Sequence, residues 1–113
     1  MAKLYKHSAV QGTANLGTYT TLYSTSASTS AVLSTIAICN AATGNATYRI
    51  GIVGSATTPS LSNGDFIAYD SVVSGNDTTF ISIGIAISNN EFIRVSSSTA
   101  SVNFNVFVSE ITP

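Results

Sequence analysis

The 113-residue sequence predicts an all-β fold, an antiparallel β-sandwich that is jelly-roll-like or immunoglobulin-like. Segments that alternate apolar and polar residues recur along the chain, at a number that suggests about seven to eight strands. No window has the apolar spacing of an amphipathic helix. Clusters of Ser, Thr, Asn and Gly separate the segments at close intervals, as turns do in a sandwich. One domain is the expectation at this length.

The beginning of the chain differs from the rest because it has no sustained apolar period. Lys3, Lys6 and His7 lie there among scattered glycines. We therefore expect an extended N-terminal arm at residues 1–17 and the sandwich domain at residues 18–113. Such an arm can become ordered on a neighbouring subunit. The alternative is a frayed terminus.

The middle of the chain contains most of the predicted strands. Ile36 and Ile38 are expected to face away from Leu33, and Tyr48 shares a face with Ile50, as the period of two requires. The strands before the last one are expected at residues 19–24, 32–40, 48–53, 66–73, 79–87 and 92–97.

An isoleucine-rich run, Phe80-Ile-Ser-Ile-Gly-Ile-Ala-Ile87, stands out within these strands. Its four isoleucines share one face, and such a strand exposed at a sheet edge would be prone to aggregation. We expect it to be central in a sheet or covered by another subunit. At eight residues the run is far too short to span a bilayer, which takes about 20 residues.

The last predicted strand, at residues 102–108, shows the alternation most clearly. Val102, Phe104, Val106 and Val108 point to one side, whereas Phe107 interrupts the polar side. This pattern suggests cover on both faces of the strand.

The composition favours assembly or binding over solubility as a free monomer. Only 8% of residues are charged, and Ser and Thr supply 33 of the 113 positions. Four Lys and Arg residues and a net charge of −1 argue against nucleic-acid binding, which needs many phosphate contacts. The chain start has no apolar run typical of a secretory signal, so we expect synthesis in the cytoplasm or removal of a leader.

Catalytic residues are sparse, and no enzymatic activity or cofactor is expected. His7 is the only histidine and lies in the expected arm, and Cys39 has no basic neighbour in sequence, so it reads as a small core residue. Most carboxylates follow turns, where loop chemistry explains them; no metal site is expected, although a weak surface Ca²⁺ site stays open as an alternative. The five carboxylates are Asp65, Asp70, Asp77, Glu91 and Glu110.

Carbohydrate binding is a second alternative, because five tyrosines could form a platform even though Trp is absent. Tyr48 and Tyr69 lie within predicted strands. We expect them to be half-buried packing residues.

The order of motifs resembles a family of small virion structural proteins of tailed phages and cyanophages, over nearly the whole chain. The resemblance implies a β-sandwich on the virion without enzymatic activity. Its place would be on the capsid as a cement (decoration) protein, or in the tail or a fibre. The motifs are Met-Ala-Lys-Leu-Tyr at 1–5, Thr-Leu-Tyr at 21–23, Ile-Ala-Ile-Cys-Asn at 36–40, Glu-Phe-Ile-Arg-Val at 91–95 and Val-Asn-Phe-Asn-Val-Phe-Val at 102–108.

The cement reading is the favoured one, because a small domain with an arm can clamp adjacent capsomers. It implies the major capsid protein as partner, a capsid-surface location in the virion after synthesis in the host cytoplasm, and a homotrimer at threefold lattice sites. No nucleic acid or membrane is expected as a partner. The alternative is a tail or fibre component, or a receptor- or carbohydrate-binding module. On the cement reading the candidate partner-binding residues are Lys3, Leu4, Tyr5, Lys6 and His7.

Overall fold

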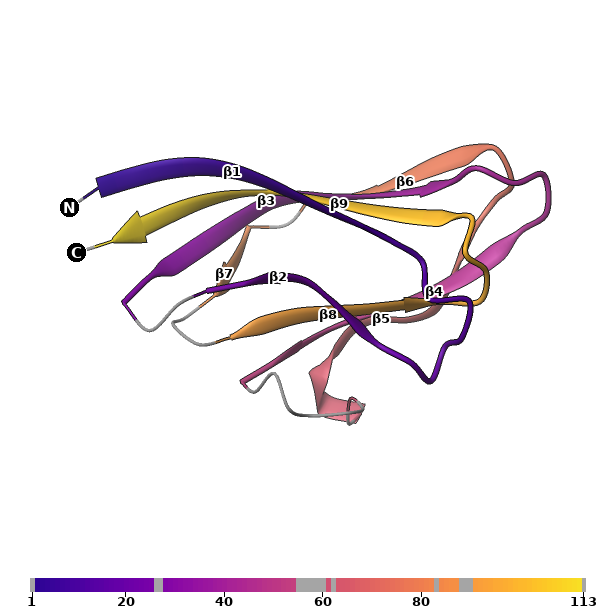
Figure 1. The fold of residues 1–113 in the computed structure, drawn as a ribbon, viewed down its shortest axis with the longest axis horizontal. Helices are drawn as coiled ribbons and strands as arrows, with labels where there is room; N and C mark the ends of the chain where they lie inside the picture. Colours follow the sequence, from indigo (N-terminus) through magenta and orange to yellow (C-terminus); the bar gives the residue numbers. More distant parts are fainter. Residues whose placement is uncertain are drawn as a thin grey trace.

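The computed structural model describes residues 2–25, 28–54, 61, 63–82, 84–87 and 91–112. Within them the chain forms nine strands in two antiparallel sheets that pack face to face (Figure 1). The predicted all-β sandwich is therefore confirmed. The first sheet contains β1 (Ala2–Gln11), β3 (Ser30–Asn40), β6 (Asp77–Ile81), β7 (Ile85–Ile87) and β9 (Val102–Thr112). The second sheet contains β2 (Thr20–Ser24), β4 (Ala46–Val53), β5 (Phe66–Val73) and β8 (Phe92–Ser97), and a 3₁₀ turn, η1 (Asn63–Asp65), precedes β5.

The strand order identifies the sandwich as a jelly roll. The first sheet runs β1-β9-β3-β6, with β7 also paired to β3, and the second runs β2-β8-β4-β5. The chain thus crosses between the sheets repeatedly, and its first and last strands lie side by side, as two interlocked Greek keys require. An immunoglobulin sandwich distributes its strands differently. The jelly-roll alternative is the one that the structure adopts.

The core lies between the sheets and is built from alternate residues of each strand. Val102, Phe104, Val106 and Val108 of β9 are all buried, as their spacing predicts. Phe104 meets Tyr48 of the opposite sheet in a T-shaped contact, with ring centroids 6.2 Å apart. Burying side chains of this size stabilises the fold by about 1.5–3 kcal/mol each.

A β-bulge in β3 changes which residues of that strand reach the core. The pairing with β9 shifts between Leu33 and Thr35, so Ser34 is the extra residue. Leu33 is consequently buried together with Ile36 and Ile38, although a strict period of two had placed it on the opposite face.

The expected N-terminal arm is wrong in its structure: residues 2–11 form β1, an edge strand of the first sheet. All ten residues of β1 are in register with β9, from Ala2 opposite Thr112 to Gln11 opposite Asn103. Backbone hydrogen bonds of the antiparallel ladder hold this strand, and they do not depend on an apolar period in its side chains. Val10 is the side chain of β1 that packs against the core.

The isoleucine-rich run is also not a central strand. It is divided into β6 and β7, which both pair with β3 and, within the described residues, with no other strand. Ile81 and Ile85 are half-buried against the core and Ile87 is fully buried, while Ile83 lies outside the described residues. The opposite sheet therefore covers the apolar face of this run.

Asn40 joins the two sheets at the end of the sandwich away from the chain termini. Its side-chain nitrogen donates to the carbonyl oxygens of Gly44 (2.8 Å) and Val73 (3.3 Å). Its oxygen accepts from the Ala42 N–H (3.1 Å) and the Ser101 hydroxyl (3.0 Å). This fully buried amide is thus hydrogen-bonded at both ends, which offsets the cost of removing it from water.

Candidate functional surfaces

The candidate partner-binding residues lie on β1, where the strand distributes them over both faces of the sheet. Tyr5 and His7 point to the outer face, and Tyr5 is 73% exposed. His7 stacks on Phe107 with ring centroids 4.9 Å apart, and its Nε2 donates to Asn105 Oδ1 at 2.8 Å. A shallow groove of about 470 Å³ lies beside these rings. The side chain of Lys3 lies outside the described residues.

Lys6 points the other way and has a partner within the chain. Its Nζ lies 3.2 Å from Glu110 Oε1, and the hydroxyl of Tyr23 donates to the other carboxylate oxygen. Burial raises the pKa of Tyr23 above its usual value, and the hydrogen bond to Glu110 adds to this shift. Leu4 is about half exposed on the same strand. This ion pair links the side chains of the edge strand and β9.

Exposed apolar side chains extend from this edge across the first sheet. Tyr5 and Phe107 are followed on the same face by Val32 of β3 and Phe80 of β6, because Val32 is in register with Ser109 and Phe80 with Ala37. All four are at least 43% exposed. We call Tyr5, Val32, Phe80 and Phe107 the outer apolar face.

Residues considered for catalysis or metal binding are dispersed. Asp77 accepts from the backbone N–H of Thr78 at 2.8 Å, and Cys39 is half-buried on β3. In the described part of the chain no three His, Cys, Asp or Glu side chains gather in a way that could hold a metal ion. None of the described segments is a helix long and apolar enough to cross a membrane.

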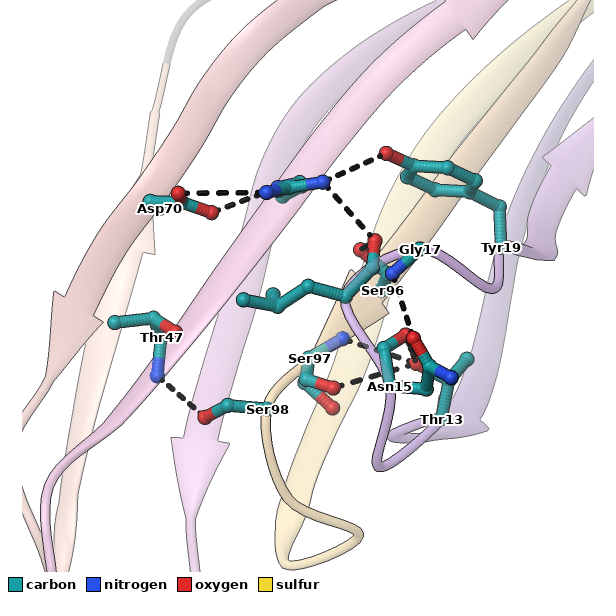
Figure 2. Close-up of polar contacts among 11 residues, drawn as sticks. Thr13, Asn15, Gly17, Tyr19, Thr47, Asp70, Ser96, Ser97 and Ser98 are labelled. Atoms are coloured by element: carbon teal, nitrogen blue, oxygen red, sulfur yellow. Dashed lines mark hydrogen bonds and ion pairs between the residues drawn. The ribbon is translucent and has the colours of Figure 1, made fainter. Parts of the chain in front are cut away.

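A second cluster lies on the outer face of the other sheet, around Arg49 of β4. Its guanidinium makes a two-point ion pair with Asp70 of β5, with Nε to Oδ1 at 2.7 Å and Nη2 to Oδ2 at 3.4 Å (Figure 2). Nη1 donates to the Leu16 carbonyl oxygen and to the Tyr19 hydroxyl, both at 3.3 Å. The guanidinium carbon also lies 4.3 Å from the ring centroid of Tyr69.

Aromatic rings extend this cluster along β5. Phe66 meets Tyr69 in a T-shaped contact with centroids 4.8 Å apart, and Tyr19 lies 6.3 Å from Phe66. A groove of about 350 Å³ runs along residues 66–69. Tyr69 is 55% exposed, so the expectation of a half-buried residue is wrong for it, whereas Tyr48 is buried in the core.

Sequence reasoning missed Arg49 and Phe66 as members of a site. One signal was present: Asp70 is a residue type that strands disfavour, yet it lies inside a predicted strand. Its partner Arg49 is 21 positions away, and only the pairing of β4 with β5 brings the two together.

Solved structures of infectious bursal disease virus contain a similar fold. The structure of the Gx strain matches 98% of this chain and 33% of its own, with a TM-score of 0.56 at 12% identity. The T13 viral particle matches 97% of this chain and 31% of its own, with a TM-score of 0.55 at 9% identity. The VP2 subviral particle matches 98% and 32%, with a TM-score of 0.50 at 11% identity.

The chain has a viral capsid-like fold. It spans about a third of the length of these viral chains. At such low identity the likeness concerns the backbone and not the surfaces. No protein-family model and no curated protein matches the sequence.

In this capsid-like fold the outer apolar face and the Arg49 cluster lie on different sheets, facing away from each other across the core. Contact at one surface therefore leaves the other accessible.

Proposed function

We propose that this chain is a phage virion structural protein, specifically a capsid cement (decoration) protein that binds the shell of major capsid protein and stabilises it. The observation that carries the proposal is the outer apolar face on a capsid-like jelly roll. Several large apolar side chains exposed on one face of a sheet favour a protein contact, because their exposure to water is unfavourable. The hydroxyl-rich surface around it costs little to desolvate.

In this proposal β1 contributes the contact residues nearest the sheet edge. Tyr5 combines a large apolar ring with a hydroxyl, which suits it to a protein interface. His7 is fixed by its stack on Phe107, so it loses little conformational freedom on binding. We include Lys3 and Leu4, nearer the chain start, among the contact residues, together with Lys6, which pairs with Glu110.

We further propose a homotrimer on the capsid surface, assembled after synthesis in the host cytoplasm. Icosahedral shells offer threefold and quasi-threefold positions, and a closed ring of three subunits satisfies each of them with one repeated contact. Native mass spectrometry of the purified protein tests this: a trimer is expected, and a monomer at every concentration would contradict it.

The copy number per particle tests the cement proposal. Quantitative mass spectrometry of purified phage should find many copies, on the scale of the capsid lattice, and the protein should bind empty shells. A few copies per particle, all in the tail fraction, would overturn the proposal.

Point variants separate the proposed contact surface from the rest of the molecule. Tyr5→Ser and Phe107→Ser should each weaken binding to empty shells by at least tenfold, which corresponds to about 1.4 kcal/mol. Val72→Ser is the matched control, because Val72 is 58% exposed on β5 of the other sheet. Equal losses in all three variants would count against the outer apolar face as the contact.

A tail or fibre component that binds a receptor or carbohydrate is the second candidate. The exposed ring of Tyr69 beside the Arg49–Asp70 ion pair favours it. Deletion of the gene should then abolish infectivity while leaving the capsid resistant to heat, whereas the cement proposal predicts fragile capsids.

A further inference from the structure

The strand pairing around Arg49 contains a β-bulge. Tyr48 is in register with Ser71 and Ile50 with Ala68, so the two residues Tyr69 and Asp70 stand opposite the single residue Arg49. Asp70 has a φ of 51°, a left-handed conformation that non-glycine residues seldom adopt. Bulges re-aim side chains, and unfavourable backbone conformations concentrate at sites with a function. Here the bulge directs both the ring of Tyr69 and the carboxylate of Asp70 toward Arg49.

Arg49 supports the other side chains of this site, and most of its own hydrogen-bond donors already have partners within the chain. Its Nε and Nη2 bind Asp70, and Nη1 binds Leu16 and Tyr19, so four hydrogen bonds hold the guanidinium. The Arg49 side chain is only 18% exposed. The guanidinium lies against the Tyr69 ring and fixes its orientation through a cation–π contact.

The groups left for a ligand are an aromatic ring and a carboxylate. Tyr69 stays 55% exposed in spite of its contacts with Arg49 and Phe66. The side chain of Asp70 is 42% exposed, and each of its oxygens accepts one bond from Arg49. A carboxylate has about four acceptor positions, so Asp70 can accept further bonds from hydroxyl groups.

We propose that this cluster binds a neutral sugar ring, with its C–H face on Tyr69 and its hydroxyl groups donating to Asp70. The face of an aromatic ring is electron-rich and attracts the weakly positive C–H groups of a pyranose. Arg49 and Asp70 neutralise one another, so the site has no net charge to attract an ionic ligand. A shallow groove of about 350 Å³, lined by residues 66–69, adjoins Asp70 in the chain and is at the small end of ligand sites.

The inference rests on the second candidate function, carbohydrate binding, and names its site and its ligand class. Because the site is on the sheet opposite to the outer apolar face, it does not rest on attachment to a shell. On a capsid surface it would face the medium and host glycans. In a tail component the site would meet glycans of the host surface during attachment.

A titration of the full-length protein with single sugars tests the inference. We would follow the ¹H–¹⁵N spectrum while adding glucose, galactose, mannose or N-acetylglucosamine to tens of millimolar, with sialic acid as the anionic comparison. Shifts confined to residues around Tyr69 and Asp70 are expected for at least one neutral sugar. Sialic acid should bind more weakly, because the Arg49–Asp70 pair leaves no free cation to bind the carboxylate of that sugar.

Variants decide whether the ring carries the binding. Tyr69→Ala should weaken binding at least tenfold, whereas Tyr69→Phe should retain it. Val72→Ala is the matched control, because it removes an exposed apolar side chain from the same strand, outside the Arg49 cluster. Asp70→Asn keeps a residue type that tolerates positive φ and should lower affinity without loss of fold.

Two outcomes would overturn the inference directly: no spectral shift with any neutral sugar, or sugar binding that Tyr69→Ala leaves unchanged. A third would be a wild-type protein that binds no sugar together with a Tyr69→Ala variant that no longer binds empty shells. The last outcome would make the cluster a protein contact. Failure of the cement proposal appears separately, as a low copy number with intact sugar binding.

Discussion

The hydroxyl of Tyr23 donates to the buried carboxylate of Glu110 and so links the two sheets at the end of the sandwich where both termini lie (Figure 1). Lys6 of the edge strand binds the other oxygen of the same carboxylate. One acidic residue therefore connects three strands. The other end is closed by Asn40, so polar groups join the sheets at both ends of an apolar core.

The pairing of Lys6 with Glu110 should be measurable as a coupling energy. Lys6→Met, Glu110→Gln and the double variant form a cycle of unfolding free energies. Because Lys6 is half exposed, solvent screens the pair and we expect a coupling of only about 1 kcal/mol, falling as salt is added. Additive single effects at low salt would show that the pair contributes nothing.

Alkaline pH should destabilise the protein through Tyr23. Burial, together with the bond to Glu110, raises the pKa of Tyr23, so the folded state holds the phenol proton more tightly than the unfolded state. The associated stability is present below the unfolded pKa of about 10 and is lost as the pH rises above it. Tyr23→Phe should make the unfolding free energy fall less steeply above that pH. Tyr5→Phe, at an exposed ring, should leave the slope unchanged.

Removing the Asn40 side chain should be costly. Asn40→Ala removes the partner of the Gly44 and Val73 carbonyl oxygens, the Ala42 N–H and the Ser101 hydroxyl, and we expect a loss of about 2–3 kcal/mol in unfolding free energy. Asn103→Ala serves as the control, since within the described residues the Asn103 amide nitrogen makes one marginal hydrogen bond, of 3.5 Å to the Ser101 carbonyl oxygen. Chemical denaturation of both variants gives the comparison. Similar losses would mean that Asn40 is not a link between the sheets.

Deleting residues 1–11 should destabilise the sandwich, although a mobile arm would be removed without effect. The deletion leaves the β9 edge without its ladder and removes Val10 from the core. For a domain of this size each kcal/mol lost lowers Tm by roughly 4 °C. Leu4→Ser, which keeps the strand, should change Tm little. An unchanged Tm after deletion would restore the arm interpretation.

Alternation and apolar runs in the sequence predicted several of the strands. The strands expected at residues 66–73 and 92–97 coincide with β5 and β8, and β9 begins at Val102 as expected. β9 is readable because every second residue from Val102 to Val108 is buried, which imposes the period of two. β8 is instead buried at almost every position, and β5 exposes Tyr69 and Val72, so their apolar runs and not a strict alternation marked them.

β1 escaped the same reasoning because it is an edge strand with polar residues on its inner face. Lys6 faces Glu110 there, and the Ser8 hydroxyl donates to the Leu22 carbonyl oxygen at 2.6 Å. Both side chains find partners that lie far away in sequence. A local pattern contains no sign of such partners.

The candidate sites likewise combine residues that the sequence pointed to with an arrangement that depends on the fold. Tyr5 and His7 were recognised as surface residues from the sequence, but their place on a paired strand was not. The cluster of Arg49, Tyr69 and Asp70 depends on a bulge between β4 and β5, and a bulge is set by the register of two strands rather than by either one.

By itself, the sequence determined that this protein is an all-β sandwich with few charges and a core made from alternate apolar residues, because burial of one strand face acts locally on every second residue. Only the tertiary structure decided that β1 pairs with β9, that the isoleucine run forms an edge, and that Arg49 meets Asp70. Those outcomes depend on hydrogen bonds between strands remote in the chain. Tyr23 and Glu110, 87 positions apart, are the plainest case.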